Sequence, residues 1–190
     1  MRLTDNRLNL RPLTAAELAL ALDNYAAAEQ SLSLNVTASP TLLDDEEMRY
    51  AMRVRHTKVL QDEQNYPWLT NWAIIHQEEQ RIIGFLILKG GPNEQGEVIL
   101  GYVIDERYWG QGYATEAVRH ITAWIFNHSD ARWVIADTEK DNTASHRVLQ
   151  HLDAELYRET EDLLWWRIPR PAIGFSSAEN TGTLQGPQSI

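Results

Sequence analysis

Two glycines separated by one residue, Gly110 and Gly112, connect an apolar segment to an amphipathic one. Glycine lets a backbone approach a ligand closely because it has no Cβ. Apolar residues recur with a helical period from Ala114 onward, so we expect a helix to begin near Gly112. The first N–H groups of a helix have no partner within it and favour a bound anion. The spacing is therefore typical of a phosphate-binding loop, or of a tight turn between a strand and a helix.

Small polar residues form a second candidate site further along the chain. Asn142, Ser145 and Leu149 are spaced by three and four residues, which places them on one face of a helix. Asp141 or Asn142 is suited to cap the start of that helix. A helix face that carries two small polar groups beside an apolar one can line a cleft.

Alternating strand and helix patterns surround both segments and must position them. Thr14 and Glu17 form a capping box, which predicts a helix that continues through Tyr25, and a long helix is expected to begin at Pro40 or Asp44. The predicted strands cover 8–13, 72–76, 82–88, 97–104, 132–138, 154–160 and 163–168, with hairpins at 72–88 and 154–168. This alternation predicts an α/β fold with a mixed sheet.

Nucleotide-binding folds use similar glycines and are the rival interpretation. A dinucleotide fingerprint requires a third small residue where this chain has Thr115, and a strand that runs directly into the first glycine, whereas residues 105–109 intervene. Asp137, at the end of the next strand, is placed as a ribose-binding acid would be. A Walker-type loop requires Gly-Lys-Ser/Thr, which the sequence lacks.

The two polar segments together resemble a known family. The pattern Arg107-x-x-Gly110-x-Gly112-x-Ala114 resembles the pyrophosphate-binding loop of the GCN5-related N-acetyltransferases (GNAT), and Asn142-x-x-Ser145 resembles their second cofactor-contacting element. The run from 113 to 117, Tyr-Ala-Thr-Glu-Ala, is similar to the RimJ/RimL branch. The resemblance extends from about residue 8 to about residue 167.

The resemblance implies a mixed, mostly antiparallel central sheet flanked by helices, with a splayed strand pair, 97–104 and 132–138, at an acyl-CoA site. It implies acetyl-CoA as cosubstrate and direct acetyl transfer to a primary amine in a ternary complex. A peptide or protein N-terminus ranks above a polyamine or amino sugar as acceptor, and a non-catalytic acyl-CoA sensor stays open. The expected cofactor-binding residues are Val103, Ile104, Arg107, Trp109, Gly110, Gln111, Gly112, Tyr113, Ala114, Thr115, Asn142 and Ser145.

Two residues are candidates for the catalytic steps. Glu97, at the start of a strand beside the expected thioester site, is the candidate base. Ser145 is the candidate to contact the departing sulfur, because Leu149 stands where many family members have a tyrosine. Ile99 likewise replaces a glutamate that many relatives carry. Arg107 is expected either to support the loop or to approach phosphate, and Trp165 with Trp166 either to floor the acceptor cleft or to pack in the sheet.

Composition limits the remaining possibilities. The 190 residues suffice for one domain, expected at 1–170, followed by a flexible tail at 171–190. The chain has no cysteine, and its six histidines have no metal-binding spacing, so we expect no metal. A net charge of −10 argues against nucleic acid and favours a cationic acceptor. The sequence has no apolar run long enough for a membrane span, so we expect a cytoplasmic protein. We expect it to be a monomer or a homodimer.

Overall fold

A computed structural model describes residues 3–4, 7–37 and 46–171. The predicted tail, apart from Pro171, and the predicted helix start at Pro40 or Asp44 lie outside the described residues. The elements are β1 Leu3–Thr4, β2 Leu8–Pro12, α1 Ala15–Asp23, α2 Tyr25–Ser31, α3 Glu46–Gln61, η2 Glu63–Asn65, α4 Tyr66–Leu69, β3 Asn71–His76, β4 Arg81–Leu88, β5 Glu97–Ile104, η3 Glu106–Tyr108, α5 Tyr113–His128, β6 Trp133–Glu139, α6 Thr143–Gln150, β7 Glu155–Glu159 and β8 Leu163–Pro169.

The strands form an eight-stranded sheet in the order β1-β2-β3-β4-β5-β6-β8-β7. Both predicted hairpins are present, β3–β4 and β7–β8, and both are antiparallel. All neighbouring strands are antiparallel except β5 and β6, which are parallel and joined through α5. The predicted mixed, mostly antiparallel sheet is therefore confirmed.

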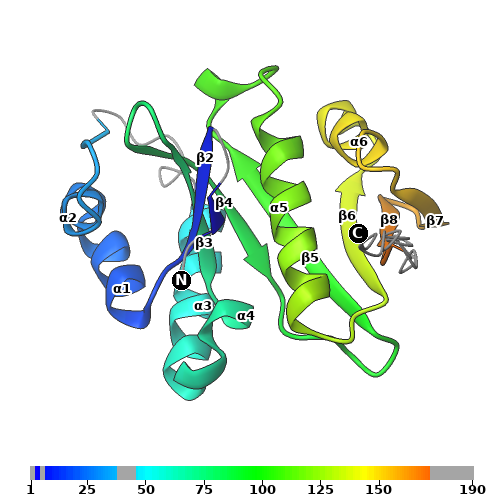
Figure 1. The fold of residues 1–190 in the computed structure, drawn as a ribbon, viewed down its shortest axis with the longest axis horizontal. Coiled ribbons are helices and arrows are strands. Elements are labelled where there is room, and N and C mark those ends of the chain that lie inside the picture. The colour runs from blue at the N-terminus through cyan, green and yellow to red at the C-terminus, as the bar shows by residue number, and fades with distance from the viewer. Residues whose placement is uncertain (1–2, 5–6, 38–45, 172–190) are drawn as a thin grey trace, which may run out of the picture.

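The parallel pair at the centre of the sheet is splayed. β5 and β6 pair only over Glu97–Ile99 and Trp133–Ile135. Beyond Ile99, β5 pairs with β4 alone, and beyond Ile135, β6 pairs with β8 alone. Figure 1 shows the two strands diverging toward the end of the molecule where α6 lies. The splayed pair implied by the family resemblance is thus present in the expected strands.

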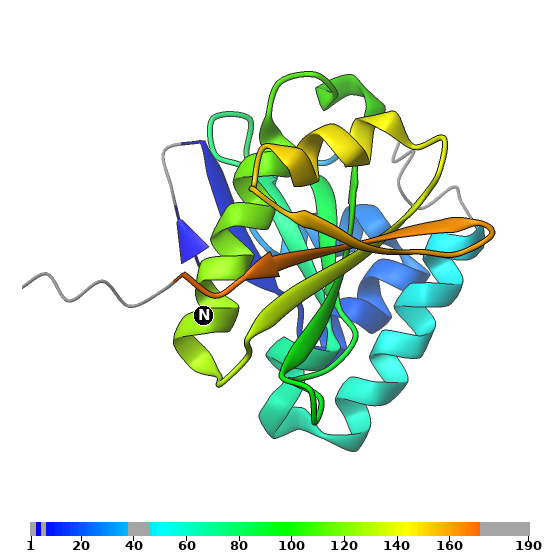
Figure 2. The same ribbon diagram turned by 90° about the vertical axis from the view of Figure 1, so that its right-hand side faces the viewer.

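Helices cover the two faces of the sheet, as the two views show (Figures 1 and 2). On one face, α5 packs its fully buried residues Ala117, Val118, Ile121 and Ile125 against the sheet. On the other face, α1, α2 and α3 cover the first strands with a second apolar cluster that includes Leu18, Met52 and Phe85. Side chains alternate along a strand, so β3, β4 and β5 each contribute to both clusters.

The first predicted helix is wrong in its extent. Instead of continuing through Tyr25, α1 ends at Asp23 and α2 begins at Tyr25. Asn24 separates them because its backbone is extended, at φ −146° and ψ 98°, and its side chain caps α2 by accepting the Ala27 N–H at 3.0 Å. The Thr14–Glu17 capping box itself is confirmed.

Arg170 fixes the far end of α5. Its guanidinium donates to the carbonyls of Phe126, Ser129 and Ala131 at 2.7, 2.5 and 2.7 Å. These carbonyls lie at or just beyond the end of the helix, where the partial negative charge of the helix dipole favours a cation. Across residues 3–4, 7–37 and 46–171, no helix has both the length and the apolar character needed to cross a bilayer.

Candidate active site

Side chains of the loop between β5 and α5 hold it in place. Asp105 is buried and accepts three hydrogen bonds from Arg107, from its backbone N–H at 3.0 Å, Nε at 2.9 Å and Nη2 at 2.6 Å. The Trp109 indole N–H donates to the Ile104 carbonyl at 2.7 Å, although the side chain as a whole is 62% exposed. Of its two expected roles, Arg107 has the contacts of a residue that supports the loop.

Both glycines adopt left-handed backbone, Gly110 at φ 72° and Gly112 at φ 82°, which favours glycine. Gly112 is the N-cap of α5, and the helix begins with a bond from the Glu116 N–H to the Gly112 carbonyl at 3.1 Å. The N–H groups of residues 113–115 precede that bond and therefore have no acceptor within the helix. We call residues 110–115 the cradle, because these N–H groups are suited to an anion.

A cation from the start of the chain lies against the cradle. Arg7 donates from Nε and Nη2 to Glu116 Oε2, at 2.8 and 2.5 Å, and from Nη1 to the Gln111 carbonyl at 3.2 Å. Its guanidinium lies over the Tyr113 ring, 4.6 Å from the centroid. Nothing in the local sequence around Arg7 indicated this position, because 109 residues separate it from Glu116.

Tyr113 anchors the cradle to the sheet. Its hydroxyl lies 2.8 Å from Nε2 of His76, and the two rings meet edge to face at 5.3 Å. His76 Nδ1 accepts the Glu79 N–H at 3.2 Å, which leaves Nε2 as the protonated nitrogen of a neutral imidazole and the donor to Tyr113. The Tyr113 side chain is thus used for support, and its backbone N–H is the group that faces the cradle.

The backbone of β5 turns toward the gap between β5 and β6. The Lys89 N–H donates to the Ile99 carbonyl at 2.9 Å, so the odd-numbered residues of β5 bond toward β4. The even-numbered residues beyond Ile99, among them Tyr102, consequently turn their N–H and C=O groups toward β6, where strand pairing has ended. Two of the predicted cofactor contacts lie on this strand. Val103 bonds toward β4, and the Ile104 carbonyl faces the gap but already accepts the Trp109 indole N–H.

The opposite side of the gap is formed by α6. Asn142 is the N-cap of this helix, as predicted, and its Oδ1 accepts the Ser145 N–H at 3.0 Å. Tyr102 reaches across the gap from β5 and donates its hydroxyl to the Ser145 carbonyl at 3.4 Å. Burial raises the pKa of Tyr102, so this phenol is protonated at neutral pH. Leu149 is completely buried against the sheet.

Glu97 lies at the closed end of the gap. Its Oε2 accepts from Asn93 Nδ2 at 3.0 Å, and its N–H donates to Asn93 Oδ1 at 2.9 Å. Glu97 pairs with Trp133, two residues before the last pair, which corresponds to about 7 Å along the strand. The Glu97 carboxylate is therefore hydrogen-bonded to the β4–β5 loop. Its catalytic role stays a prediction.

The two tryptophans of β8 point to opposite faces of the sheet. Trp166 is buried with Leu149 and donates its indole N–H to Thr138 Oγ1 at 3.1 Å. Trp165 faces the other side, where the Arg158 guanidinium lies 5.5 Å from its ring centroid. Trp166 therefore packs in the sheet, and a role of Trp165 in lining the acceptor cleft stays a prediction.

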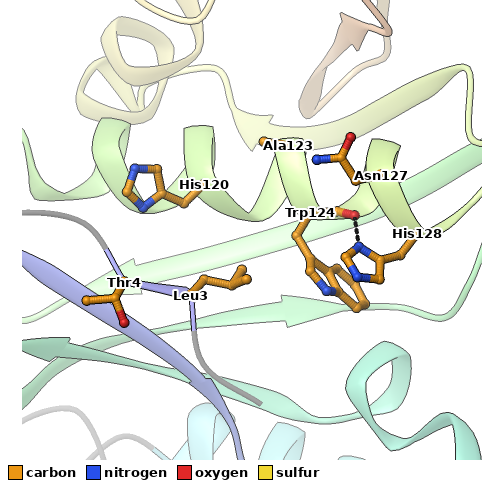
Figure 3. Close-up of a pocket in the computed structure, with 7 residues that line it drawn as sticks. All are labelled: Leu3, Thr4, His120, Ala123, Trp124, Asn127 and His128. Atoms are coloured by element: carbon orange, nitrogen blue, oxygen red, sulfur yellow. Dashed lines mark hydrogen bonds between the residues drawn. The ribbon is translucent and has the colours of Figure 1, made fainter.

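A depression of about 560 Å³ lies along the outer side of α5 (Figure 3). It is lined by Leu3, Thr4, His120, Ala123, Trp124, Asn127 and His128, and it contains none of the predicted site residues. His128 is exposed, stacks on Trp124 and bonds through Nδ1 to the Trp124 carbonyl at 2.9 Å. In the described ranges no three His, Asp or Glu side chains gather in a way that could hold a metal ion.

A search for known families decides between the acyl-CoA and dinucleotide interpretations. The family model for the acetyltransferase (GNAT) domain matches residues 7–155, most of the chain. The chain belongs to the GNAT family. Members of this family use acetyl-CoA. The GNAT match spans the cradle, the gap and α6 together.

Two curated relatives from Bacillus support the assignment. The uncharacterized N-acetyltransferase YjdG of Bacillus subtilis (strain 168) is 24% identical over 96 residues, which span 50% of this chain and 57% of that protein. The match therefore covers little more than half of YjdG. The uncharacterized N-acetyltransferase p20 of Bacillus licheniformis is 24% identical over 146 residues, which span 77% of this chain and 78% of p20.

Solved structures share the fold. The ribosomal L7/L12 α-N-protein acetyltransferase RimL, in complex with coenzyme A, superposes with a TM-score of 0.62 at 16% identity, covering 89% of this chain and 98% of RimL. At this identity the likeness concerns the arrangement of helices and strands. It shows that this chain has the GNAT arrangement of helices and strands.

Proposed function

We propose that this protein transfers the acetyl group of acetyl-CoA to a primary amine. The observation that carries the proposal is the continuous path along β5, in which the cradle at one end leads into the gap beside Tyr102. The N–H groups of the cradle are suited to the pyrophosphate, and the backbone groups in the gap are suited to the amides of the pantetheine arm. Of the predicted cofactor contacts, residues 110–115, Asn142 and Ser145 are the ones that we propose border this path.

Transfer by direct attack needs positioning and a neutral amine. At pH 7, deprotonation costs about 1.4 kcal/mol for an α-amine of pKa near 8 and about 4.6 kcal/mol for a lysine. Holding the amine beside the thioester supplies a large part of the remaining barrier reduction. Ser145 is proposed to contact the sulfur, and Tyr102, which lies beside it, adds a protonated phenol on the same side of the gap.

The acceptor that we favour is the α-amine of a peptide or protein. The similarity to RimL and the net charge of −10, which attracts cationic substrates, support this choice over a polyamine or an amino sugar. A non-catalytic acyl-CoA sensor is the second candidate, because Leu149 is buried where many family members have a tyrosine. A cytoplasmic location, one domain at 1–170 and a monomer or homodimer stay predictions.

Calorimetric titration with acetyl-CoA and with NAD tests the cofactor part of the proposal. The wild type should bind acetyl-CoA and not NAD, and Gly112→Glu should lose binding because its carboxylate occupies the cradle. A matched Gly91→Glu variant, in an open loop outside the path, should bind normally. Thiol release from acetyl-CoA with peptides and polyamines then separates enzyme from sensor. Folded wild type that fails to bind acetyl-CoA would overturn the proposal.

A further inference from the structure

A carboxylate that the predicted catalytic set does not include lies at the opening of the gap. Asp137 lies two positions beyond Ile135, the last residue of β6 that pairs with β5. Alternation along the strand puts its side chain on the same face as Ile135, which is the face turned away from α5 and α6. The Asp137 side chain is 26% exposed, so it is partly desolvated and still reachable.

An ammonium group already lies next to this carboxylate. Lys89 Nζ is 3.5 Å from Asp137 Oδ1. The Lys89 backbone bonds to Ile99 on the β4 side of β5, so the side chain must cross β5 to reach β6. With Lys89 48% exposed and the contact long, the ion pair is weak, and another ammonium can displace Lys89 at little cost.

Gly101 leaves open space beneath this ion pair. The parallel register that pairs Ile99 with Ile135 brings Gly101 level with Asp137. Apart from Gly101 itself and its two chain neighbours, no described residue has a heavy atom within 4 Å of the position that a Cβ on Gly101 would occupy, and its backbone is not left-handed. The space is next to the β5 backbone that borders the gap, on the side open to an acceptor.

Aromatic side chains surround the carboxylate. Trp165 is the residue opposite Asp137 on β8, and its indole N–H is buried with no hydrogen-bond partner among the described residues. Tyr157 lies on β7, and its pKa is raised by partial burial, then by Glu97 and more weakly by Asp137, against the opposing effects of Arg158 and Arg167. The guanidiniums of Arg158 and Arg167 already lie 5.5 Å from the centroids of Trp165 and Tyr157, so these rings are in use as cation contacts and the carboxylate is the group left for an ammonium ion.

We infer that Asp137 is the acceptor-side carboxylate, which binds the ammonium of the substrate over Gly101 in place of Lys89. The inference rests on the proposed acetyl transfer. One ammonium proton passes to Asp137 and on to solvent. The freed nitrogen pair forms a bond to the thioester carbon, the C–S bond breaks, and the thiolate takes the second proton that nitrogen loses. The sum is amide, CoA thiol and one released proton.

Glu97 is less well placed for this step. It lies at the closed end of the gap, and Asn93 already donates to its carboxylate at 3.0 Å. Asp137 lies beyond the last pair between β5 and β6 and carries a cation that can be exchanged. The two carboxylates are therefore separable by mutation.

The test compares four variants, one of them a control, with the wild type. The probes are spermidine and a hexapeptide with a free N-terminal serine. Their binding is measured by calorimetry on CoA-loaded protein, and their turnover by thiol release from acetyl-CoA. Asp137→Asn should weaken binding of the accepted probe and lower kcat/KM by about 100-fold, the range of a lost general base, with acetyl-CoA affinity unchanged. Asp130→Asn, an exposed aspartate on the α5–β6 connection, is the matched control and should behave as wild type.

The direction of the change in KM for Lys89→Gln distinguishes a competing cation from a structural ion pair. If Lys89 competes with the substrate, its removal should lower KM for the amine several-fold. If the ion pair is purely structural, Lys89→Gln and Asp137→Asn should both raise KM for the amine. Gly101→Val should fold and bind acetyl-CoA but lose the amine. Wild-type turnover in Asp137→Asn, or CoA-loaded wild type that binds neither probe, would overturn the inference. Loss of acetyl-CoA binding by the wild type would instead contradict the proposed function.

Discussion

At the scale of single residues, the positive φ of 82° at Gly112 is what allows the cradle to form. We predict that Gly112→Ala costs about 1–3 kcal/mol in unfolding free energy, because a left-handed non-glycine residue is strained. The nearest atom to the added Cβ is Arg7 Nη2 at 3.7 Å, so strain rather than collision is the cause. Urea unfolding measures this loss.

The same substitution should also weaken acetyl-CoA binding by about tenfold, equivalent to about 1.4 kcal/mol, as the Cβ crowds the approach to the N–H groups. Gly91→Ala is the control, since Gly91 lacks a positive φ and has open space around its Cβ position. Equal stability of Gly112→Ala and Gly91→Ala would contradict the role assigned to the left-handed backbone.

We predict that Tyr108 contributes to the loss of stability at alkaline pH. Burial, and then its 2.6 Å hydrogen bond to Glu79 Oε2, raise the pKa of Tyr108 to about 12. A pKa raised above the unfolded value near 10 gives stability that is complete below pH 10 and lost as pH rises through 12. Because the side chain is partly exposed, we expect less than about 1 kcal/mol.

Tyr108→Phe should remove this part of the pH dependence between pH 10 and 12. Stability curves of both proteins, measured at intervals of pH with urea, provide the comparison. An unchanged slope in Tyr108→Phe would show that other groups account for alkaline unfolding.

Residue roles were predictable where the local backbone alone determines them. Gly110, Gly112 and Asn142 satisfy needs of a turn or a helix start, and each lies where its spacing indicated. Arg7 and Asp137 owe their positions to tertiary packing. Asp137 was indicated by sequence only as the acid of a dinucleotide fold, because no local pattern shows that β5 and β6 separate just before it.

At the scale of elements, Arg7 links the segment before β2 to the first turn of α5. We predict that Arg7→Gln lowers acetyl-CoA affinity, since the variant loses a positive charge beside the cradle and the bonds that hold Gln111 and Glu116. The ion pair is exposed on the arginine side, so its coupling to stability should be about 0.2–1 kcal/mol.

A double-mutant cycle with Glu116→Gln separates the two effects of Arg7. The affinity loss should persist in Arg7→Gln on the Glu116→Gln background if Arg7 charge acts on the ligand. Equal affinities of the Glu116→Gln single variant and the double variant would mean that Arg7 acts only by holding Glu116. Acetyl-CoA calorimetry on the four proteins gives the answer.

Elements were predicted well where periodicity was strong, and their boundaries less so. The predicted helix from Thr14 through Tyr25 divides at Asn24, whose own side chain supplies the cap for α2. The two tryptophans of β8 were treated as a unit, whereas alternation sends them to opposite faces. The splay followed from the family resemblance, because strand propensity does not indicate where pairing stops.

At the scale of the whole molecule, β5 joins the two halves of the sheet. It contributes Val98, Leu100 and Ile104 to the cluster under α5, and Val103 packs against the cluster under α1, α2 and α3. Beyond Ile99 only β4 holds this strand within the sheet. A ligand that fills the gap would supply the missing partner, so cofactor binding should stabilise the entire fold.

We predict that acetyl-CoA at one hundred times its Kd raises the unfolding free energy by about 2.7 kcal/mol, or Tm by roughly 5–10 °C. Amide hydrogen exchange should slow most in the cradle and at the even-numbered residues of β5 that face the gap, and least in β7 at the sheet edge. Gly112→Glu should show neither effect. Protection spread evenly over all strands would mean that the ligand stabilises the fold without pairing to β5, because a strand-like partner in the gap must protect the groups that it contacts more than those at the edge.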